Sequence, residues 1–403
     1  MGSPASTMLL SGIIFAVALA CGGYFAFSKR LESSTSWKAT VTPLASIMGS
    51  GFLISAPLLA GVTGNYAVLC MAVLLIVAYL VGGAIRFNIR HFEPIEKKRG
   101  GAQEVALLSR FVLAGSYFIS VTYYLQLLAA FALHIIGVEG LEAARWVTTG
   151  LLVLIGSIGV WRGLDELESV EKYAVSLNLG MIVALLVGLL IYNVELVVGG
   201  QWHLPDIDSG INLHDLRVLL GLLIVVQGFE TSRYLGESHP AEQRISTMRA
   251  AQLISTAVYL LFLGLTTVLF HKGLGAHVTA IIEMCRPVAV VLPVLLTIAA
   301  IGSQFSAAVA DDSGAGGLIE DLSGGRLPAR YVYLLIMLVT VAVTWETNVN
   351  QVIAYASRAF ALYYALQCIV ASLVARKKGR SGVGFFALAV VCLAVFAFGV
   401  PTG

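Results

Sequence analysis

Long apolar runs, separated by short polar stretches that hold most of the charge, recur along the whole chain. Twelve of these runs are close to the length of about 20 residues that an α-helix needs to cross a bilayer. They are residues 8–27, 39–62, 65–85, 105–136, 146–161, 169–198, 215–236, 247–271, 287–310, 329–345, 348–374 and 382–400. The pattern predicts an all-α polytopic membrane protein with about 12 transmembrane helices.

The composition agrees with a membrane protein and disfavours several other classes. Of the 403 residues, 58% are hydrophobic and 12% are charged, whereas roughly 25% are charged in a typical soluble domain. The net charge of +2 does not favour binding to nucleic acid. Phosphate-binding glycine motifs and metal-ligand spacings are missing, and the five cysteines form no CxxC pair. We therefore expect no enzyme, no metal site and no bound cofactor.

The basic residues predict how the helices are oriented. Twenty of the 25 Lys and Arg residues fall in alternate loops, and this bias marks cytoplasmic loops. The first run is followed, not preceded, by Lys29 and Arg30, so a cleaved signal peptide is not expected. The sequence thus predicts a multi-pass protein of the inner (plasma) membrane with both termini outside the cytoplasm.

Two of the predicted helices carry glycine and polar residues near their middle. The first reads Ser46-Ile47-Met48-Gly49-Ser50-Gly51-Phe52, and the second reads Gln227-Gly228-Phe229-Glu230. Their equivalence predicts two five-helix repeats, 39–198 and 215–374, which are inverted because each holds an odd number of helices. The remaining parts are an extra N-terminal helix with its loop (1–38), an external linker (199–214) and a C-terminal accessory helix (375–403).

The two breaks predict a binding site at the middle of the membrane. Unwound backbone must line a polar cavity or be covered by protein, because lipid cannot hydrogen bond to it. N–H groups around Gly49 to Gly51 would suit a carboxylate, and carbonyl groups around Gly228 would suit an ammonium group. The alternative is a close-packing motif and a simple kink. The candidate substrate-binding residues here are Ser46, Met48, Gly49, Ser50, Gly51, Phe52, Gln227, Gly228 and Phe229.

Charged side chains within the predicted spans mark further candidates, because burying a charge in a membrane is costly. Glu230 lies near the middle of its helix and is a candidate for ion coupling. Arg358 needs an acid or several carbonyls beside it, and Glu230 matches it best in depth, which favours a structural or gating ion pair. Asp311 and Asp312 are more typical of a solvated helix end, with a proton or cation exit path as the alternative.

The broken segments resemble a known family. Residues 46–61 (SIMGSGFLISAPLLAG) are similar to the broken first helix of the amino acid–polyamine–organocation (APC) transporter superfamily. Gly228-Phe229-Glu230, followed by Gly236-Glu237 and Pro240, is similar to its sixth helix. The resemblance implies a LeuT-like five-plus-five inverted repeat with broken first and sixth helices, and secondary transport by alternating access.

The resemblance also implies roles for single residues. An acid at the position of Glu230 is implicated in proton sensing in some members. In sodium-coupled relatives, hydroxyls such as those of Ser303 and Ser306 join carbonyls like those of Ile47 and Met48 around Na⁺. An aromatic residue on the third helix, here Tyr117 or Tyr124, often caps the substrate. Helix packing is the more common use of such Ser and Tyr residues. The ion-coupling candidates are Glu230, Ile47, Ser303, Ser306 and Asp311, and the ion is H⁺ or Na⁺.

The sequence as a whole predicts a secondary active transporter of a small amino acid or related amine. Its partners would be a small-molecule substrate and the lipid bilayer, with the oligomeric state left open. One alternative is an inorganic cation transporter on the same fold, with Met48 and Glu230 as ligands. The other is a non-transporting membrane sensor or partner subunit.

Overall fold

The computed structural model describes residues 4–138, 140–236, 238–274 and 277–402, without the side chains of residues 4–7, 50, 165–172 and 329. Within this part the chain is helical and contains no strand. The α-helices are α1 (Pro4–Phe27), α2 (Lys29–Ser33), α3 (Thr35–Ser50), α4 (Phe52–Thr63), α5 (Ala67–His91), α6 (Gly101–Ile135), α7 (Leu141–Arg162), α8 (Asp165–Val198), α9 (Leu213–Gly221), α10 (Ala241–Thr266), α11 (Ala280–Cys285), α12 (Leu292–Leu322), α13 (Ala329–Glu346), α14 (Val349–Lys377) and α15 (Val383–Phe398). Five 3₁₀ segments join them: η1 (Gly64–Tyr66), η2 (Glu93–Ile95), η3 (Leu223–Val226), η4 (Phe229–Leu235) and η5 (Thr267–Leu269).

The helices confirm that this is an all-helical membrane protein. Each of the twelve predicted spans overlaps helical chain, and the span 215–236 is interrupted at Leu222 and at Gln227–Gly228. Eight described stretches are long and apolar enough to cross a membrane, and the longest of them, Thr35–His91, holds two predicted spans. The interrupted segment from α9 to η4, together with α13 and α15, lies outside that set. The count of 12 spans therefore stays a prediction.

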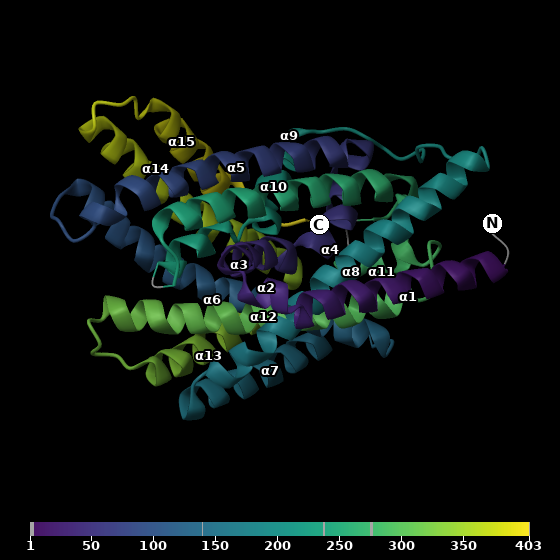
Figure 1. Cartoon of the computed structure of the whole chain (residues 1–403), viewed down its shortest axis with the longest axis horizontal. Coiled ribbons are helices and arrows are strands. Elements are labelled where there is room, and N and C mark those ends of the chain that lie inside the picture. Colours follow the sequence, from purple (N-terminus) through teal and green to yellow (C-terminus); the bar gives the residue numbers. More distant parts are fainter. Residues whose placement is uncertain (1–3, 139, 237, 275–276, 403) are drawn as a thin grey trace.

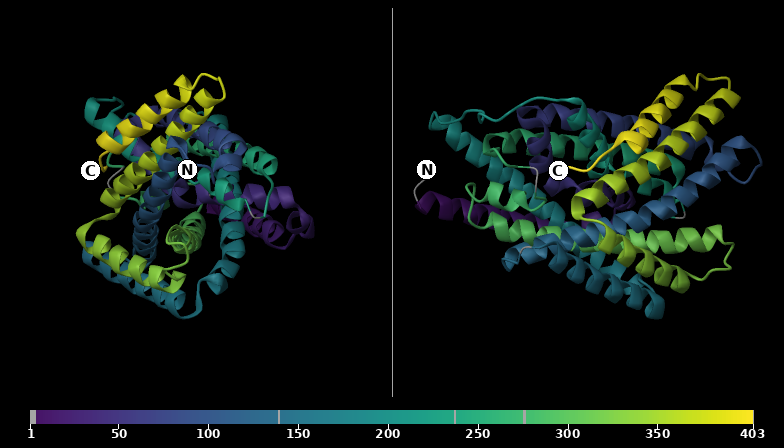
Figure 2. Two further views of the ribbon diagram at one scale, coloured as in Figure 1. Left: turned by 90° about the vertical axis from the view of Figure 1, so that its left-hand side faces the viewer. Right: turned by 180° about the vertical axis from the view of Figure 1, so that it is seen from behind.

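Most of the long helices run roughly along the long axis of the molecule (Figure 1). The longest, α6, packs against both α12 and α14, while α1 lies along α8. Figure 2 shows α7 and α13 together along one side of the bundle. An interrupted helix followed by four long helices occurs first in 35–198 and again in 213–377, where α11 is added. That order suits the predicted repeats, whose inverted symmetry stays a prediction.

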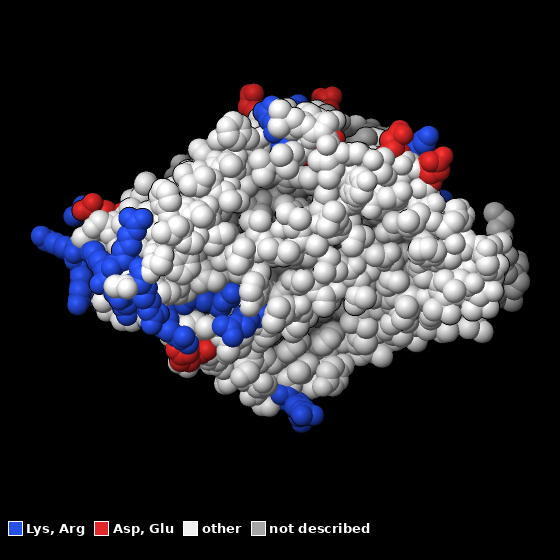
Figure 3. Space-filling model, turned by 90° about the horizontal axis from the view of Figure 1, so that it is seen from above, with Lys and Arg blue, Asp and Glu red and all other residues white. Residues whose placement is uncertain are grey.

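Lys and Arg side chains gather at one end of the molecule, which we call the basic end (Figure 3). Its exposed members in the α5–α6 loop, at the end of α14 and just after it are Lys97, Lys98, Arg99, Arg376, Lys377, Lys378 and Arg380. Arg90 at the end of α5 pairs with Glu242 at the start of α10. The neighbouring Gln243 donates to Thr35, which places the start of α3 at the basic end as well. That this end faces the cytoplasm stays a prediction.

The interrupted helices lie inside the bundle and not on its surface. Phe52, the first residue of α4, and Phe229, the first residue of η4, are each only 1% exposed. Tyr259 of α10 is fully buried beside them, and its ring packs edge-on against that of Phe52. The core of the molecule therefore surrounds the two positions at which the sequence predicts breaks.

Candidate functional site

The first break is narrower than the sequence predicts. Helix α3 continues through Gly49 to Ser50, and α4 begins at Phe52, so Gly51 is the single residue between them. The N–H of Ser55 already donates to the carbonyl of Gly51 at 3.1 Å. The expected unwinding of Gly49 and Ser50 is therefore absent, and the side chain of Ser50 lies outside the described residues.

The second break is wide. Helix α9 ends at Gly221, the chain tightens into η3, and Gln227 is extended with φ −83° and ψ 175°. Gly228 then has φ +114°, a left-handed conformation that glycine adopts readily and other residues rarely do. The N–H of Ile224 donates a hydrogen bond to the hydroxyl of Ser357 on α14 at 2.9 Å. This part of the second predicted break is thus present and is covered by protein, as irregular backbone in a membrane must be.

The two breaks touch each other. A Cβ placed on Gly228 would lie 2.7 Å from the carbonyl carbon of Ser46 and 2.8 Å from the nitrogen of Ile47. A Cβ on Gly51 would collide with the backbone of Val225. The hydroxyl of Tyr259 donates to the carbonyls of Ile47 and Val225, and so bridges the two segments. Segments far apart in the sequence therefore meet with backbone against backbone.

A buried cluster of polar side chains lies beside the second break. It comprises Tyr124, Gln227, Glu230 and Tyr364, which we call the central cluster, and each member is at most 2% exposed. The amide of Gln227 donates to the Tyr124 hydroxyl at 3.2 Å. Glu230 accepts from the Tyr364 hydroxyl at 2.7 Å and from the N–H of Gly228 at 3.0 Å. Among the described residues no cation pairs with Glu230.

Tyr364 is a member that the sequence analysis missed. It lies on α14, next to Tyr363, in a helix whose apolar pattern gives no sign of a polar role. Its ring stacks on that of Phe229, with centroids 5.1 Å apart and planes 17° from parallel. A tyrosine in a membrane helix usually has a partner for its hydroxyl, and this was the signal available.

The predicted ion-coupling residues are only partly brought together. The hydroxyl of Ser303 donates to the carbonyl of Gly49 at 2.7 Å, and Gln304 donates to the same carbonyl at 3.1 Å. The predicted partners were instead the carbonyls of Ile47 and Met48. The carbonyl of Ile47 accepts a hydrogen bond from the Tyr259 hydroxyl instead. Met48 is buried. Ser306, one turn along α12, has no hydrogen bond to α3 among the described residues.

The predicted pairing of Arg358 with Glu230 is wrong for this conformation. The Nε of Arg358 donates to the carbonyl of Phe396 on α15 at 2.7 Å. Its guanidinium carbon also lies 5.8 Å from the centre of the Phe396 ring. Glu230 contacts α14 at Tyr364, six residues further along the helix, whereas Arg358 is turned towards α15. Arg358 therefore joins α14 to the last helix.

The two acids of α12 have different environments. Asp311 is half-buried and accepts a hydrogen bond from Ser120 on α6. Asp312 is 3% exposed, and its Oδ1 has no hydrogen-bond partner. The expectation of a solvated helix end is therefore wrong for Asp312, because α12 extends ten residues further and stays packed there.

A vestibule with a volume of about 880 Å³ opens at the basic end. This volume is in the size range of ligand pockets. Its lining comes from η2, α6, η4, α10 and α12: Glu93, Glu96, Lys97, Arg110, Leu113, Tyr117, Arg233, Tyr234, Gly236, Arg244, Gly314, Gly317, Leu318 and Asp321. Arg244 binds both oxygens of Glu93, at 3.0 and 2.7 Å. Arg110 pairs with Asp321, which joins α6 to α12. The vestibule is thus walled by ion pairs.

Aromatic side chains lie between the vestibule and the central cluster. Tyr117, which lines the vestibule, packs edge-on against Phe360, with ring centroids 6.2 Å apart. The ring centroid of Phe360 in turn lies 6.3 Å from that of Tyr364. The ring centroid of Tyr363 lies 5.5 Å from that of Tyr364. We call Tyr117, Phe360, Tyr363 and Tyr364 the aromatic layer. Of the two predicted capping residues, Tyr117 belongs to this layer and Tyr124 to the central cluster.

The chain is similar to known proteins along most of its length. A family model described as an APC superfamily transporter matches residues 29–399. An uncharacterized protein from Aquifex aeolicus (strain VF5) is 44% identical over 385 residues, which cover 93% of each chain. The matched range includes both breaks, the central cluster and the vestibule.

Proposed function

The chain belongs to the APC superfamily of transporters, and on that premise we propose that it moves a small amino acid or related amine by alternating access. The contact between the two breaks carries this proposal. Irregular backbone is tolerated at membrane depth only where it is covered or lines a cavity, and secondary transporters place their substrates at such points. Gly228 against Ser46 and Ile47 is a contact of that kind.

In the proposed site, the carboxylate of the substrate meets the N-terminus of α4. That helix begins at Phe52 without a side-chain cap, so its first N–H groups are available to an anion. The ammonium group of the substrate meets the extended backbone around Gln227. Because the two breaks touch in this conformation, the substrate must separate them, and the vestibule provides its route from the basic end.

We further propose that the coupling ion is a proton and that Glu230 carries it. A charged carboxylate without a cationic partner is costly to bury in a membrane, and Glu230 is 1% exposed. The carbonyls of Ile47 and Gly49 already accept hydrogen bonds from Tyr259, Ser303 and Gln304, which disfavours Na⁺ at this point. The described residues also contain no group of three His, Cys, Asp or Glu side chains suited to a metal ion.

Two experiments test the proposal in sequence. A thermal-shift screen of amino acids, amines and organic acids, with and without Na⁺, identifies ligands of the purified protein. Uptake of each ligand into proteoliposomes then separates transport from binding. Accumulation under a proton gradient supports the proposal. Stabilisation by a ligand without any flux contradicts it and favours a non-transporting sensor.

A further inference from the structure

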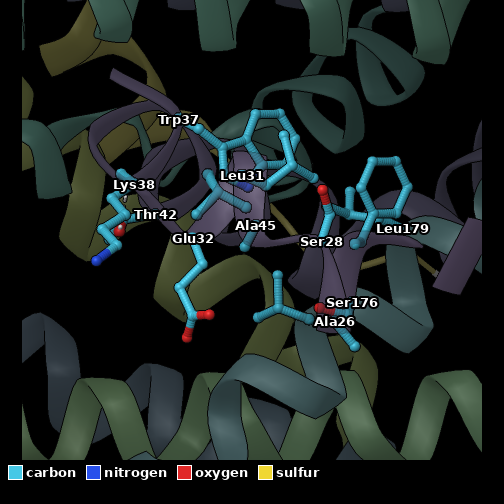
Figure 4. Close-up of a pocket in the computed structure, with 13 residues that line it drawn as sticks. Ala26, Ser28, Leu31, Glu32, Trp37, Lys38, Thr42, Ala45, Ser176 and Leu179 are labelled. Carbon is cyan, nitrogen blue, oxygen red and sulfur yellow. Dashed lines mark hydrogen bonds between the residues drawn. The ribbon is translucent and has the colours of Figure 1, made fainter. Parts of the chain in front are cut away.

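A second cavity lies between α1, α2, α3 and α8, outside the central cluster (Figure 4). Its volume is about 400 Å³, which is within the range of ligand pockets. It is lined by Phe25, Ala26, Ser28, Leu31, Glu32, Trp37, Lys38, Val41, Thr42, Ala45, Val175, Ser176 and Leu179. None of these residues belongs to the two breaks, the central cluster or the vestibule.

The lining along α3 is charged at Lys38 and, apart from Thr42, apolar further along. Lys38, Val41, Thr42 and Ala45 are spaced so that they share one face of the helix. Lys38 is near the start of α3 at the basic end, and Ala45 lies seven residues, or about 10 Å, further along the helix axis. The cavity therefore offers a charged mouth and a mostly apolar interior, a combination that suits an amphiphile.

The charge at the mouth favours an anion. Lys38 is exposed, and among the described residues its ammonium group has no ion pair. Lys29 and Arg30 are exposed on the neighbouring helix α2. Among the described residues, one acid, Glu32, also lines the cavity. Clusters of basic residues beside a membrane helix attract anionic lipid head groups.

Close packing forms the walls of the cavity. Where α1 crosses α8, a Cβ on Gly180 would lie 2.7 Å from the Cα of Gly22, so the two backbones are in direct contact. On the other side, the ring of Trp37 stacks on that of Phe25, with centroids 5.8 Å apart and planes 10° from parallel. The pocket is thus held open by the packing of its own walls.

We propose that this cavity binds one anionic phospholipid of the surrounding bilayer. Its phosphate lies at Lys38, and an acyl chain lies against Val41, Ala45 and Leu179. Binding itself is independent of any substrate. Because α3 also ends at the first break, a lipid held between α3 and α8 restrains a helix that alternating access must move, and this consequence rests on the proposed function.

Trp37 provides a direct readout, because bromine atoms on an acyl chain quench a nearby indole. The full chain is placed in phosphatidylcholine bilayers that contain a rising fraction of phosphatidylglycerol, with either lipid brominated in its chains. We expect saturable extra quenching with brominated phosphatidylglycerol, and its loss in Trp37→Phe. In Lys38→Ala, the fraction of phosphatidylglycerol that gives half of the maximal extra quenching should rise about fivefold. Lys98→Ala, which removes an exposed lysine elsewhere at the basic end, should leave it unchanged.

The other results overturn the proposal. Equal quenching by the two brominated lipids would mean that Trp37 meets only bulk lipid. If this fraction is unchanged in Lys38→Ala, the phosphate does not lie at Lys38. If a brominated fatty acid quenches more strongly than brominated phosphatidylglycerol, the cavity holds a different occupant. Ala45→Phe fills the interior and should abolish the extra quenching. None of these measurements needs flux, so they fail or succeed independently of the proposed transport.

Discussion

The hydroxyl of Tyr364 donates a hydrogen bond of 2.7 Å to the same carboxylate oxygen of Glu230 that accepts from the N–H of Gly228. Glu230 is thus hydrogen bonded both to α14 and to the backbone of the second break. Hydrogen bonds to a charged carboxylate are roughly twice as strong as those between neutral groups. Protonation of Glu230 would therefore loosen Gly228 and Tyr364 together, which provides a physical link between a proton and the proposed substrate site.

Replacing Glu230 with Gln removes the exchangeable proton but keeps the shape of the side chain. We expect proton-driven accumulation to fall by about tenfold or more, because hydrogen bonds to a charged group contribute about 1.5–3 kcal/mol. Exchange of labelled for unlabelled substrate across the membrane, which needs no net proton movement, should persist. Accumulation by Glu230→Gln at the level of the unmodified protein would remove this acid from the coupling step.

Tyr364→Phe removes a single hydroxyl while the ring can still stack on Phe229. We expect slower substrate exchange and lower thermal stability, by about 1.5–3 kcal/mol in the free energy of unfolding. Tyr363→Phe is the matched control, since the Tyr363 hydroxyl contacts Tyr234 at 3.3 Å and not Glu230. If the two variants behave alike, the hydrogen bond to Glu230 has no special role.

Gly228→Ala tests the contact between the breaks. The φ of +114° costs a residue with a Cβ roughly 1–3 kcal/mol, and the added methyl group would collide with Ser46 and Ile47. We expect lower thermal stability and the loss of both uptake and exchange. Gly115→Ala on α6 is the control, because a Cβ there meets no atom within 4 Å. Normal uptake by Gly228→Ala would show that the breaks need not touch.

Arg358→Gln tests whether Arg358 attaches α14 to α15 or takes part in gating. Its guanidinium holds the Phe396 carbonyl of α15, so the variant should unfold at a lower temperature. The ratio of protons to substrate should stay the same, because Arg358 does not contact Glu230 in this structure. Isotope flux measured together with internal pH gives that ratio. A changed ratio would return Arg358 to the coupling machinery.

The sequence predicts the positions of the helices better than it predicts the contacts between them. Apolar length located the helices, and the glycines of the two breaks located the centre of the bundle, because both features are local. Which face of a helix meets which neighbour depends on its rotation, and apolar spans carry little periodic signal for that. Arg358 was therefore assigned to the wrong partner, and Tyr364 was missed altogether.

The extent of each break shows the same limit. The pattern Gly49-Ser50-Gly51 predicts three unwound residues, yet α3 continues to Ser50. Glycine permits unwinding without requiring it, and Ser303 and Gln304 accommodate the Gly49 carbonyl within a continuous helix. At Gly228 the chain is unwound, because there the left-handed φ is adopted and Ser357 satisfies the freed N–H of Ile224.

In the proposed transport cycle, a proton gradient drives a small amino acid or amine through a site between the two breaks. Uptake of a labelled ligand from the thermal-shift screen into proteoliposomes with an imposed proton gradient tests it most directly. We expect accumulation above the external concentration, its collapse when a protonophore is added, and its absence in Gly228→Ala but not in Gly115→Ala. If no amino acid, amine or small organic acid accumulates under a proton or a sodium gradient, the protein is not a transporter of this kind.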